Sequence, residues 1–212
     1  MSILKSIPIL FMQSIKSRKK KAKLILGSAS PFRKKLLQEA GFVFDVKTAD
    51  IDEKSIRHKD FKKLVLAIGL AKKDAILRKN KLSRNTILIT SDLVVAHNGR
   101  LREKPVSKKE VISWHKEYSR SGETKVYCSI IVHNVGLNKT LKAVDIVSIK
   151  WSKIPDRVIE EMANHPMTYK GAGFVGRAYL HYAKSTKGAI DTVVGLPVRI
   201  LEEFLEKLGY YK

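Results

Sequence analysis

The 212-residue sequence predicts a mixed α/β fold, and three of its stretches carry this prediction. The apolar run 24–26 suits a short buried strand and leads at once into a helix start. The apolar, β-branched run 86–90 is typical of a central strand. Two long strand segments, 126–133 and 140–151, are joined by a turn at 136–139. Strand–helix units combined with an antiparallel meander indicate a mixed sheet.

The remaining elements are predicted in chain order. Ser30 and Pro31 favour the N-terminus of a helix, and Gly41 favours its end. Apolar residues at helical spacing predict a helix over 60–79. The dipeptide Asn98-Gly99 predicts a tight hairpin turn. Further expected elements are a strand at 42–46 and helices at 107–119, 155–163 and 198–208.

The turn between the first strand and the first helix has the chemistry of an anion site. Gly27 opens the turn, Ser28 and Ser30 carry hydroxyl groups, and three basic residues follow at 33–35. Unpaired N–H groups at a helix start attract anions such as phosphate. An ordinary strand–turn–helix junction with exposed lysines is the alternative, and the local sequence favours neither.

Acidic residues at two places in the sequence stand out in a chain with few acidic residues. Asp50, Asp52 and Glu53 lie within four residues, where they can hold Mg²⁺ beside phosphates or cap the following helix. Spacing alone slightly favours capping. Asp92 follows the strand 86–90, at the end of a sheet strand where α/β proteins place ligands. A structural Asp92 would cap or pair locally, and we favour a role in metal binding or catalysis.

The net charge of +22 indicates attraction to polyanions. Many lysines fall on the polar faces of predicted helices, which favours a solvated basic surface over a dedicated nucleic-acid platform. Residues 1–23 contain no acidic residue and are interpreted as a basic N-terminal extension, followed by one domain over 24–212. The single cysteine, Cys128, excludes an intramolecular disulfide and indicates a reducing compartment, the cytoplasm. No apolar run approaches the ~20 residues of a membrane span.

Several segments together resemble the Maf family of nucleotide pyrophosphatases. The resemblance runs from Leu24 to the C-terminus in the expected order and spacing. Its segments are Ser28-Ala29-Ser30-Pro31-Phe32-Arg33-Lys34, Asp50-Ile51-Asp52-Glu53, Ser91-Asp92, Glu103-Lys104-Pro105, Ser121-Gly122, Ala172-Gly173 and Val194-Gly195-Leu196-Pro197.

This resemblance implies an elongated, two-lobed architecture similar to the ITPase fold, with a central cleft. It also implies Mg²⁺- or Mn²⁺-dependent hydrolysis of a nucleoside triphosphate to the monophosphate and pyrophosphate. Ser30, Arg33 and Lys104 would hold the phosphates. Glu53 and Asp92 would bind the metal, and Asp92 would orient or deprotonate the attacking water. The expected catalytic residues are Asp92, Lys104 and Arg33, and the expected substrate-binding residues are Ser28, Ser30, Phe32, Arg33, Lys34 and Lys73.

The finer motif resembles the branch of the family that acts on 7-methyl-GTP more than the dTTP/UTP branch. Phe32 follows Pro31 where the latter branch carries arginine, and Ser91 precedes Asp92 where it carries alanine. An aromatic ring at Phe32 can stack on a cationic methylated base, or pack in the core. Members of the family are often dimers, which leaves a homodimer open for this chain.

Three positions depart from the family pattern, and at one of them Leu93 replaces the polar residue that the family carries after the aspartate. Asp74 stands where the family carries lysine, so Lys72 or Lys73 is left to supply the charge, and we assign it to Lys73. Ala178 falls nearest to a position where the family carries Gln or Glu. With the high charge, these departures support an alternative: a degenerate relative that binds nucleotides or nucleic acid without hydrolysis. The retained acidic and basic residues favour the enzyme.

Overall fold

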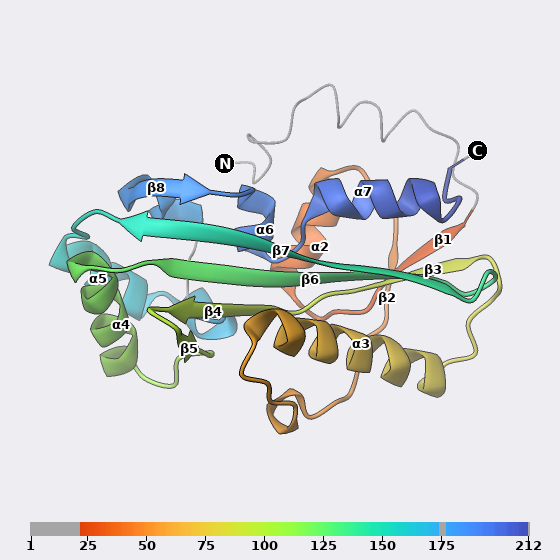
Figure 1. Ribbon diagram of the computed structural model, residues 1–212, viewed down its shortest axis with the longest axis horizontal. Helices are drawn as coiled ribbons and strands as arrows, with labels where there is room; N and C mark the ends of the chain where they lie inside the picture. Colours follow the sequence, from red (N-terminus) through yellow and green to blue (C-terminus); the bar gives the residue numbers. More distant parts are fainter. Residues whose placement is uncertain (1–21, 174–176, 212) are drawn as a thin grey trace.

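The computed structural model describes residues 22–173 and 177–211 and shows an elongated molecule built on one mixed sheet (Figure 1). The predicted N-terminal extension lies outside the described residues except for its last two positions. The sheet has eight strands. They are β1 (Lys23–Leu26), β2 (Asp45–Val46), β3 (Thr86–Thr90), β4 (Leu93–His97), β5 (Arg100–Arg102), β6 (Thr124–Asn134), β7 (Lys139–Trp151) and β8 (Ala183–Lys187).

Strand β6 organises the sheet. Along one edge it pairs antiparallel with β4 and then with β3, and along the other edge with β7 over its whole length. β1 joins β3 in parallel and β2 joins β1 in parallel, whereas β5 pairs with β4 and β8 pairs with β7. β3 and β4 therefore occupy successive stretches of one edge of β6. Only Ser91 and Asp92 separate them. These two residues therefore lie where one half of the molecule, built on β1, β2 and β3, meets the other half, built on β4, β5 and β8.

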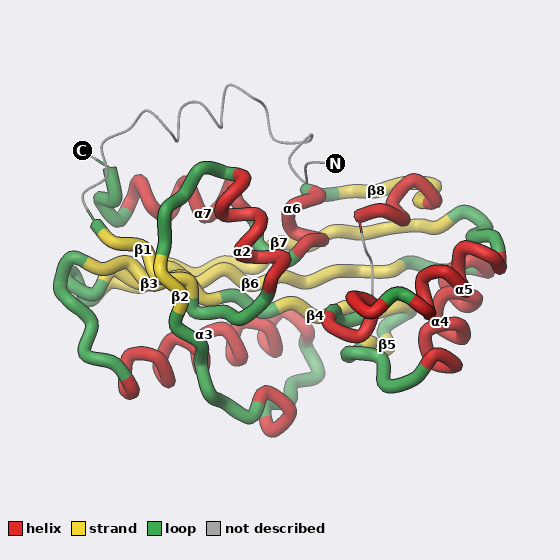
Figure 2. Tube along the Cα trace, turned by 180° about the vertical axis from the view of Figure 1, so that it is seen from behind, coloured by secondary structure: helices red, strands yellow, loops and turns green. Residues whose placement is uncertain are grey.

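Helices cover both faces of the sheet (Figures 1 and 2). Helices α2 (Pro31–Glu39) and α7 (Val198–Lys207) cover one face beside β1 and β3, and α3 (Phe61–Lys79) covers the opposite face. Helices α4 (Lys108–Arg120) and α5 (Asp156–Asn164) pack together at the far end. The shorter elements are η1 (Glu53–Ser55), η2 (Pro166–Lys170), η3 (Arg177–Tyr182) and α6 (Ile190–Val194).

The apolar runs in β1 and β3 are continuous because both strands are buried on both faces. Leu26 and Ile89 belong to the core that α2 and α7 cover. Ile25 and Leu88 point the other way and pack with Ile76 of α3. Burial on two sides gives these strands no polar alternation, which is why the sequence shows short uninterrupted runs.

The mixed α/β prediction is confirmed, with three differences in detail. Of the strand expected at 42–46, only Asp45 and Val46 pair with β1, because Phe42 turns into the core with its ring 6.4 Å from that of Tyr210. Strand β8 was not predicted, because it is a mostly exposed edge strand without apolar alternation. Helix α6, five residues long, was not among the predicted elements. No helix in the described part of the chain is long and apolar enough to cross a membrane.

Candidate active site

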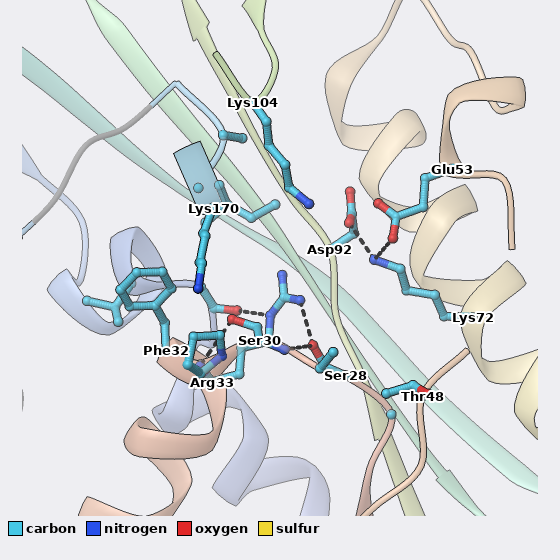
Figure 3. A pocket seen from close by; sticks show the side chains of 18 of the residues that line it. Ser28, Ser30, Phe32, Arg33, Thr48, Glu53, Lys72, Asp92, Lys104 and Lys170 are labelled. Carbon is cyan, nitrogen blue, oxygen red and sulfur yellow. Dashed lines mark hydrogen bonds and ion pairs between the residues drawn. The ribbon is translucent and has the colours of Figure 1, made fainter. Parts of the chain in front are cut away.

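A cavity of about 590 Å³ opens where the two halves of the sheet meet (Figure 3). One wall is the loop after β1 together with the start of α2. The junction of β3 and β4 and the start of η1 form another wall. The lining is completed by the segment 169–172, the end of α6, residues 48 and 49, Lys72 of α3 and Lys104. Segments far apart in the sequence thus converge on one space large enough for a small-molecule ligand.

The loop after β1 is built around the hydroxyl groups of two serines. Ser28 Oγ accepts hydrogen bonds from Ser30 N (3.2 Å) and from Arg33 Nη1 (3.1 Å). Ser30 caps α2, since its Oγ accepts from Arg33 N at 3.4 Å. Gly27 is required here because a Cβ atom would lie 2.6 Å from Thr90 Cγ2 and 3.1 Å from Ile89 O. The loop is therefore held tightly against the end of β3.

Arg33 is buried, with 8% of its surface exposed, and it is fixed by neutral acceptors. Its Nε donates to the carbonyl oxygen of Gly195 at 2.8 Å, and the Ser91 hydroxyl donates to the same oxygen at 3.1 Å. Gly195 caps α6 with φ = 119°, a left-handed conformation that favours glycine. No carboxylate among the described residues pairs with Arg33. A buried guanidinium without a local counter-ion favours the binding of an anion.

The opposite side of the cavity holds a buried ion cluster. Lys72 Nζ of α3 lies 2.7 Å from Asp92 Oδ1 and 3.0 Å from Glu53 Oε1 (Figure 3). Lys72 and Asp92 have side chains 9% and 8% exposed, whereas that of Glu53 is 48% exposed. Asp92 is held in the gap between β3 and β4 by its backbone, since its N–H donates to Ser129 Oγ and its carbonyl accepts from Ser129 N, both at 2.9 Å. One ammonium group thus joins two carboxylates from different elements.

Two further lysines line the cavity without a hydrogen bond or ion pair to any described residue. Lys104 follows β5 and points toward the space between Arg33 and Asp92 (Figure 3). Lys170 ends η2 and points from the other half of the molecule toward the loop that carries Ser30. Among the described lining residues, four cationic side chains therefore face two anionic ones. This excess of positive charge suits a polyanionic ligand.

The structure brings most of the predicted site residues to this cavity. Those that line it are Ser28, Ser30, Phe32, Arg33, Glu53, Asp92 and Lys104. Lys34 and Lys73 do not line it. Neighbours on a helix point about 100° apart, so Lys73 points away from the carboxylates that Lys72 contacts. Lys73 Nζ instead lies 2.8 Å from Asp74 Oδ1. The assignment to Lys73 is therefore corrected: Lys72 is the residue that faces the carboxylates.

Sequence reasoning left two cationic lining residues unassigned: Lys72, which it weighed against Lys73, and Lys170, which it did not consider. A signal existed for Lys72, because Ile68, Lys72 and Ile76 are spaced by four residues and all three are buried on one face of α3. No comparable periodicity marks Lys170. Asp74 stands where the family carries lysine, but Lys72 supplies the positive charge beside Asp92 and Glu53. The site therefore keeps a cation next to its carboxylates. The Ala178 departure lies outside the residues whose side chains are described.

The three carboxylates of the 50–53 segment serve different purposes. Asp52 caps η1, with its Oδ1 accepting from Lys54 N at 3.0 Å. Asp50 is exposed and lies 4.0 Å from Lys79 Nζ. Glu53 alone reaches the cavity. The capping interpretation thus holds for Asp52, and the cavity position singles out Glu53.

Mg²⁺ or Mn²⁺ fits the pair of Asp92 and Glu53 by donor chemistry. Each carboxylate contacts Lys72 and has a second oxygen that can accept another ligand. The described residues contain no group of three or more His, Cys, Asp or Glu side chains placed to hold a metal ion. The protein would therefore supply two carboxylates, and water and phosphate oxygens would complete the shell, as is usual for Mg²⁺.

Comparisons with known proteins identify a family and several relatives. The model of a family described as Maf-like protein matches residues 23–208. A 7-methyl-GTP pyrophosphatase from Dictyostelium discoideum is 31% identical over 192 residues, covering 88% of this chain and 97% of the relative. A dTTP/UTP pyrophosphatase from Clostridium botulinum (strain Okra / Type B1) is 30% identical over 190 residues, with the same coverage.

A solved structure, that of a HAM1 protein from Coxiella burnetii, superimposes with a TM-score of 0.51. The match covers 88% of this chain and 98% of that chain at 12% sequence identity. At this identity the likeness concerns the fold alone.

Proposed function

Because the chain belongs to the Maf-like protein family, we propose that it is a nucleotide pyrophosphatase, which hydrolyses a nucleoside triphosphate to the monophosphate and pyrophosphate. One observation carries the proposal. The ion cluster of buried Asp92 and Lys72 with half-exposed Glu53 faces Arg33 and Lys104 across a single cavity. A single bound ligand can therefore contact both the carboxylates, which can activate water, and the cations, which can hold phosphates.

Arg33 and Lys104 bind the phosphates in this proposal. Arg33 is already oriented by Ser28 and by the Gly195 carbonyl, so little side-chain freedom remains to be lost when a phosphate binds. Lys104 reaches the cavity from the other half of the molecule and offsets the charge that develops on the leaving pyrophosphate. Ser28 and Ser30 shape the loop, and its N–H groups at the start of α2 add an anion-binding contribution.

Asp92 orients the attacking water and accepts its proton as the new oxygen–phosphorus bond forms and the bond to pyrophosphate breaks. Lys72 holds Asp92 Oδ1 at 2.7 Å, which fixes the carboxylate in one orientation. Mg²⁺ or Mn²⁺, held by Asp92 and Glu53, would polarise the phosphate and lower the pKa of bound water. Lys72 keeps the two carboxylates from repelling each other while the cavity is empty.

We favour a modified purine triphosphate such as 7-methyl-GTP as the substrate, with dTTP or UTP next. Phe32 lines the cavity, where its ring can stack on a cationic methylated base. The relatives named above act on these two substrate classes according to their names. We place the activity in the cytoplasm, because the only thiol, Cys128, is buried in β6 and makes no disulfide.

The test is pyrophosphate release from 7-methyl-GTP, dTTP, UTP and CTP with Mg²⁺ or Mn²⁺. We expect Asp92→Asn to lower turnover at least ~100-fold, since it removes the general base. Asp156→Asn, at an exposed position of α5, serves as the matched control and should retain full activity. A folded wild-type protein that releases no pyrophosphate from any of the four would refute the enzyme and favour a basic nucleotide-binding module.

A further inference from the structure

We propose that Lys170 is a substrate-binding residue that contacts the polyphosphate chain, an inference that rests on the proposed pyrophosphatase function. Its ammonium group points into the cavity toward the loop with Ser30 and Arg33 (Figure 3). It forms no hydrogen bond or ion pair with any described residue. The group is therefore available to an incoming anion.

The backbone that presents Lys170 is anchored on its N-terminal side. Thr168 is fully buried, and its Oγ1 donates to the Met162 carbonyl at 2.6 Å. The Tyr169 hydroxyl donates to the Ala163 carbonyl at 2.7 Å. Both bonds attach η2 to the last turn of α5. The position of Lys170 is thus set by a packed helix rather than by a free loop.

The same segment is tied to Lys104 on its C-terminal side. Gly173 N donates to the carbonyl of Glu103 at 3.0 Å, and the Tyr118 hydroxyl donates to the Gly173 carbonyl at 3.3 Å. Gly173 has φ = 54°, and a Cβ atom there would lie 2.5 Å from Val95 Cβ, so this close approach requires glycine. Lys104 and Lys170 are therefore presented from the same half of the molecule, opposite Arg33 (Figure 3).

The charge of each part of the substrate indicates which part Lys170 contacts. Both acidic side chains of the cavity contact Lys72, and neither of them lies within ion-pair distance of Lys170. Lys104, Lys170 and Arg33 then repel one another until an anion lies between them. A triphosphate carries several negative charges, whereas a nucleobase carries none. Lys170 therefore contacts phosphate oxygens, opposite the loop with Ser28 and Ser30.

The experiment compares Lys170→Ala and Lys170→Arg with Lys184→Ala, a matched control at an exposed lysine of β8 outside the cavity. Binding of inorganic tripolyphosphate is measured by calorimetry, and kcat/KM is measured with 7-methyl-GTP, dTTP and UTP. We expect Lys170→Ala to weaken tripolyphosphate binding and to lower kcat/KM about tenfold for all three nucleotides, with the loss mainly in KM. Lys170→Arg should retain most of both, and Lys184→Ala should match the wild type.

Wild-type affinity for tripolyphosphate in Lys170→Ala would overturn the inference. A loss of kcat/KM confined to one base would also overturn it, because it would place Lys170 at the base instead of the phosphates. The binding measurement needs no turnover. If no variant hydrolyses any nucleotide, the proposed function fails, while tripolyphosphate binding still decides the role of Lys170.

Discussion

Replacing Lys72 with methionine tests the buried ion cluster directly. Methionine has nearly the length of lysine and keeps the apolar stem packed, so the change removes chiefly the ammonium group. The variant leaves Asp92 and Glu53 as two carboxylates facing one cavity, where Lys72 Nζ had been 2.7 Å from one and 3.0 Å from the other. Asp92 is almost fully buried, so its charge loses the partner that compensates for lost hydration.

The expected magnitude follows from burial. Removing one partner of a buried pair typically lowers the free energy of unfolding by about 3–5 kcal/mol. Glu53 is half-exposed and the cavity admits water, so we expect a smaller loss of about 2–3 kcal/mol at pH 7. Adding Asp92→Asn removes the stranded charge and should restore part of the loss, which gives a coupling energy of at least about 1.5 kcal/mol.

Urea unfolding of the wild type, both single variants and the double variant measures this coupling, provided that the m-value stays constant. The pair Arg157 and Glu161 of α5 is the control, since its atoms are 3.7 Å apart and its side chains are 86% and 59% exposed. Its coupling energy should stay below about 0.5 kcal/mol. A coupling energy between Lys72 and Asp92 as small as that of the control would refute the reasoning.

Three further predictions concern the loop contacts and the other half of the sheet. Ser91→Ala removes one of the two hydrogen-bond donors to the Gly195 carbonyl, so we expect the free energy of unfolding in urea to fall by about 1 kcal/mol. Arg33 would be held less firmly, so KM should rise, and an unchanged KM would contradict this. Gly195→Ala places a side chain at φ = 119° and should lower the free energy of unfolding by about 1–3 kcal/mol, whereas unchanged stability would argue against that backbone conformation. Burial lowers the pKa of His97 below 6.5, so the unfolded chain binds more protons than the folded protein does near that pH. The free energy of unfolding should therefore decrease as the pH falls below 6.5, by up to about 1.4 kcal/mol per pH unit. His97→Phe should remove that part of the pH dependence, and parallel stability curves for the two proteins between pH 7.5 and 5.5 would contradict it.

Local sequence patterns predicted the elements whose structure follows from the type and spacing of residues close together in the chain. The strand 86–90 and the placement of Asp92 after it follow from a buried apolar run that ends in polar residues. The helix over Phe61–Lys79 follows from its apolar spacing. The same spacing could have identified Lys72 rather than Lys73, because Lys72 shares a face with Ile68 and Ile76. Strand β8 gave no such signal, since it is a mostly exposed edge strand that pairs with β7.

By itself, the sequence determined the mixed α/β class and the capped start of α2, which depend on residues within about one helical turn or one strand of each other. The set of charged residues suited to phosphate chemistry followed from the ordered motifs that resemble the Maf family. Only the tertiary structure decided which charges meet. Arg33 is oriented by Gly195, 162 positions away, and Lys72 joins Asp92 to Glu53 across three elements. Such contacts arise from the way β6 brings β3 and β4 end to end, and local patterns carry no information about that pairing.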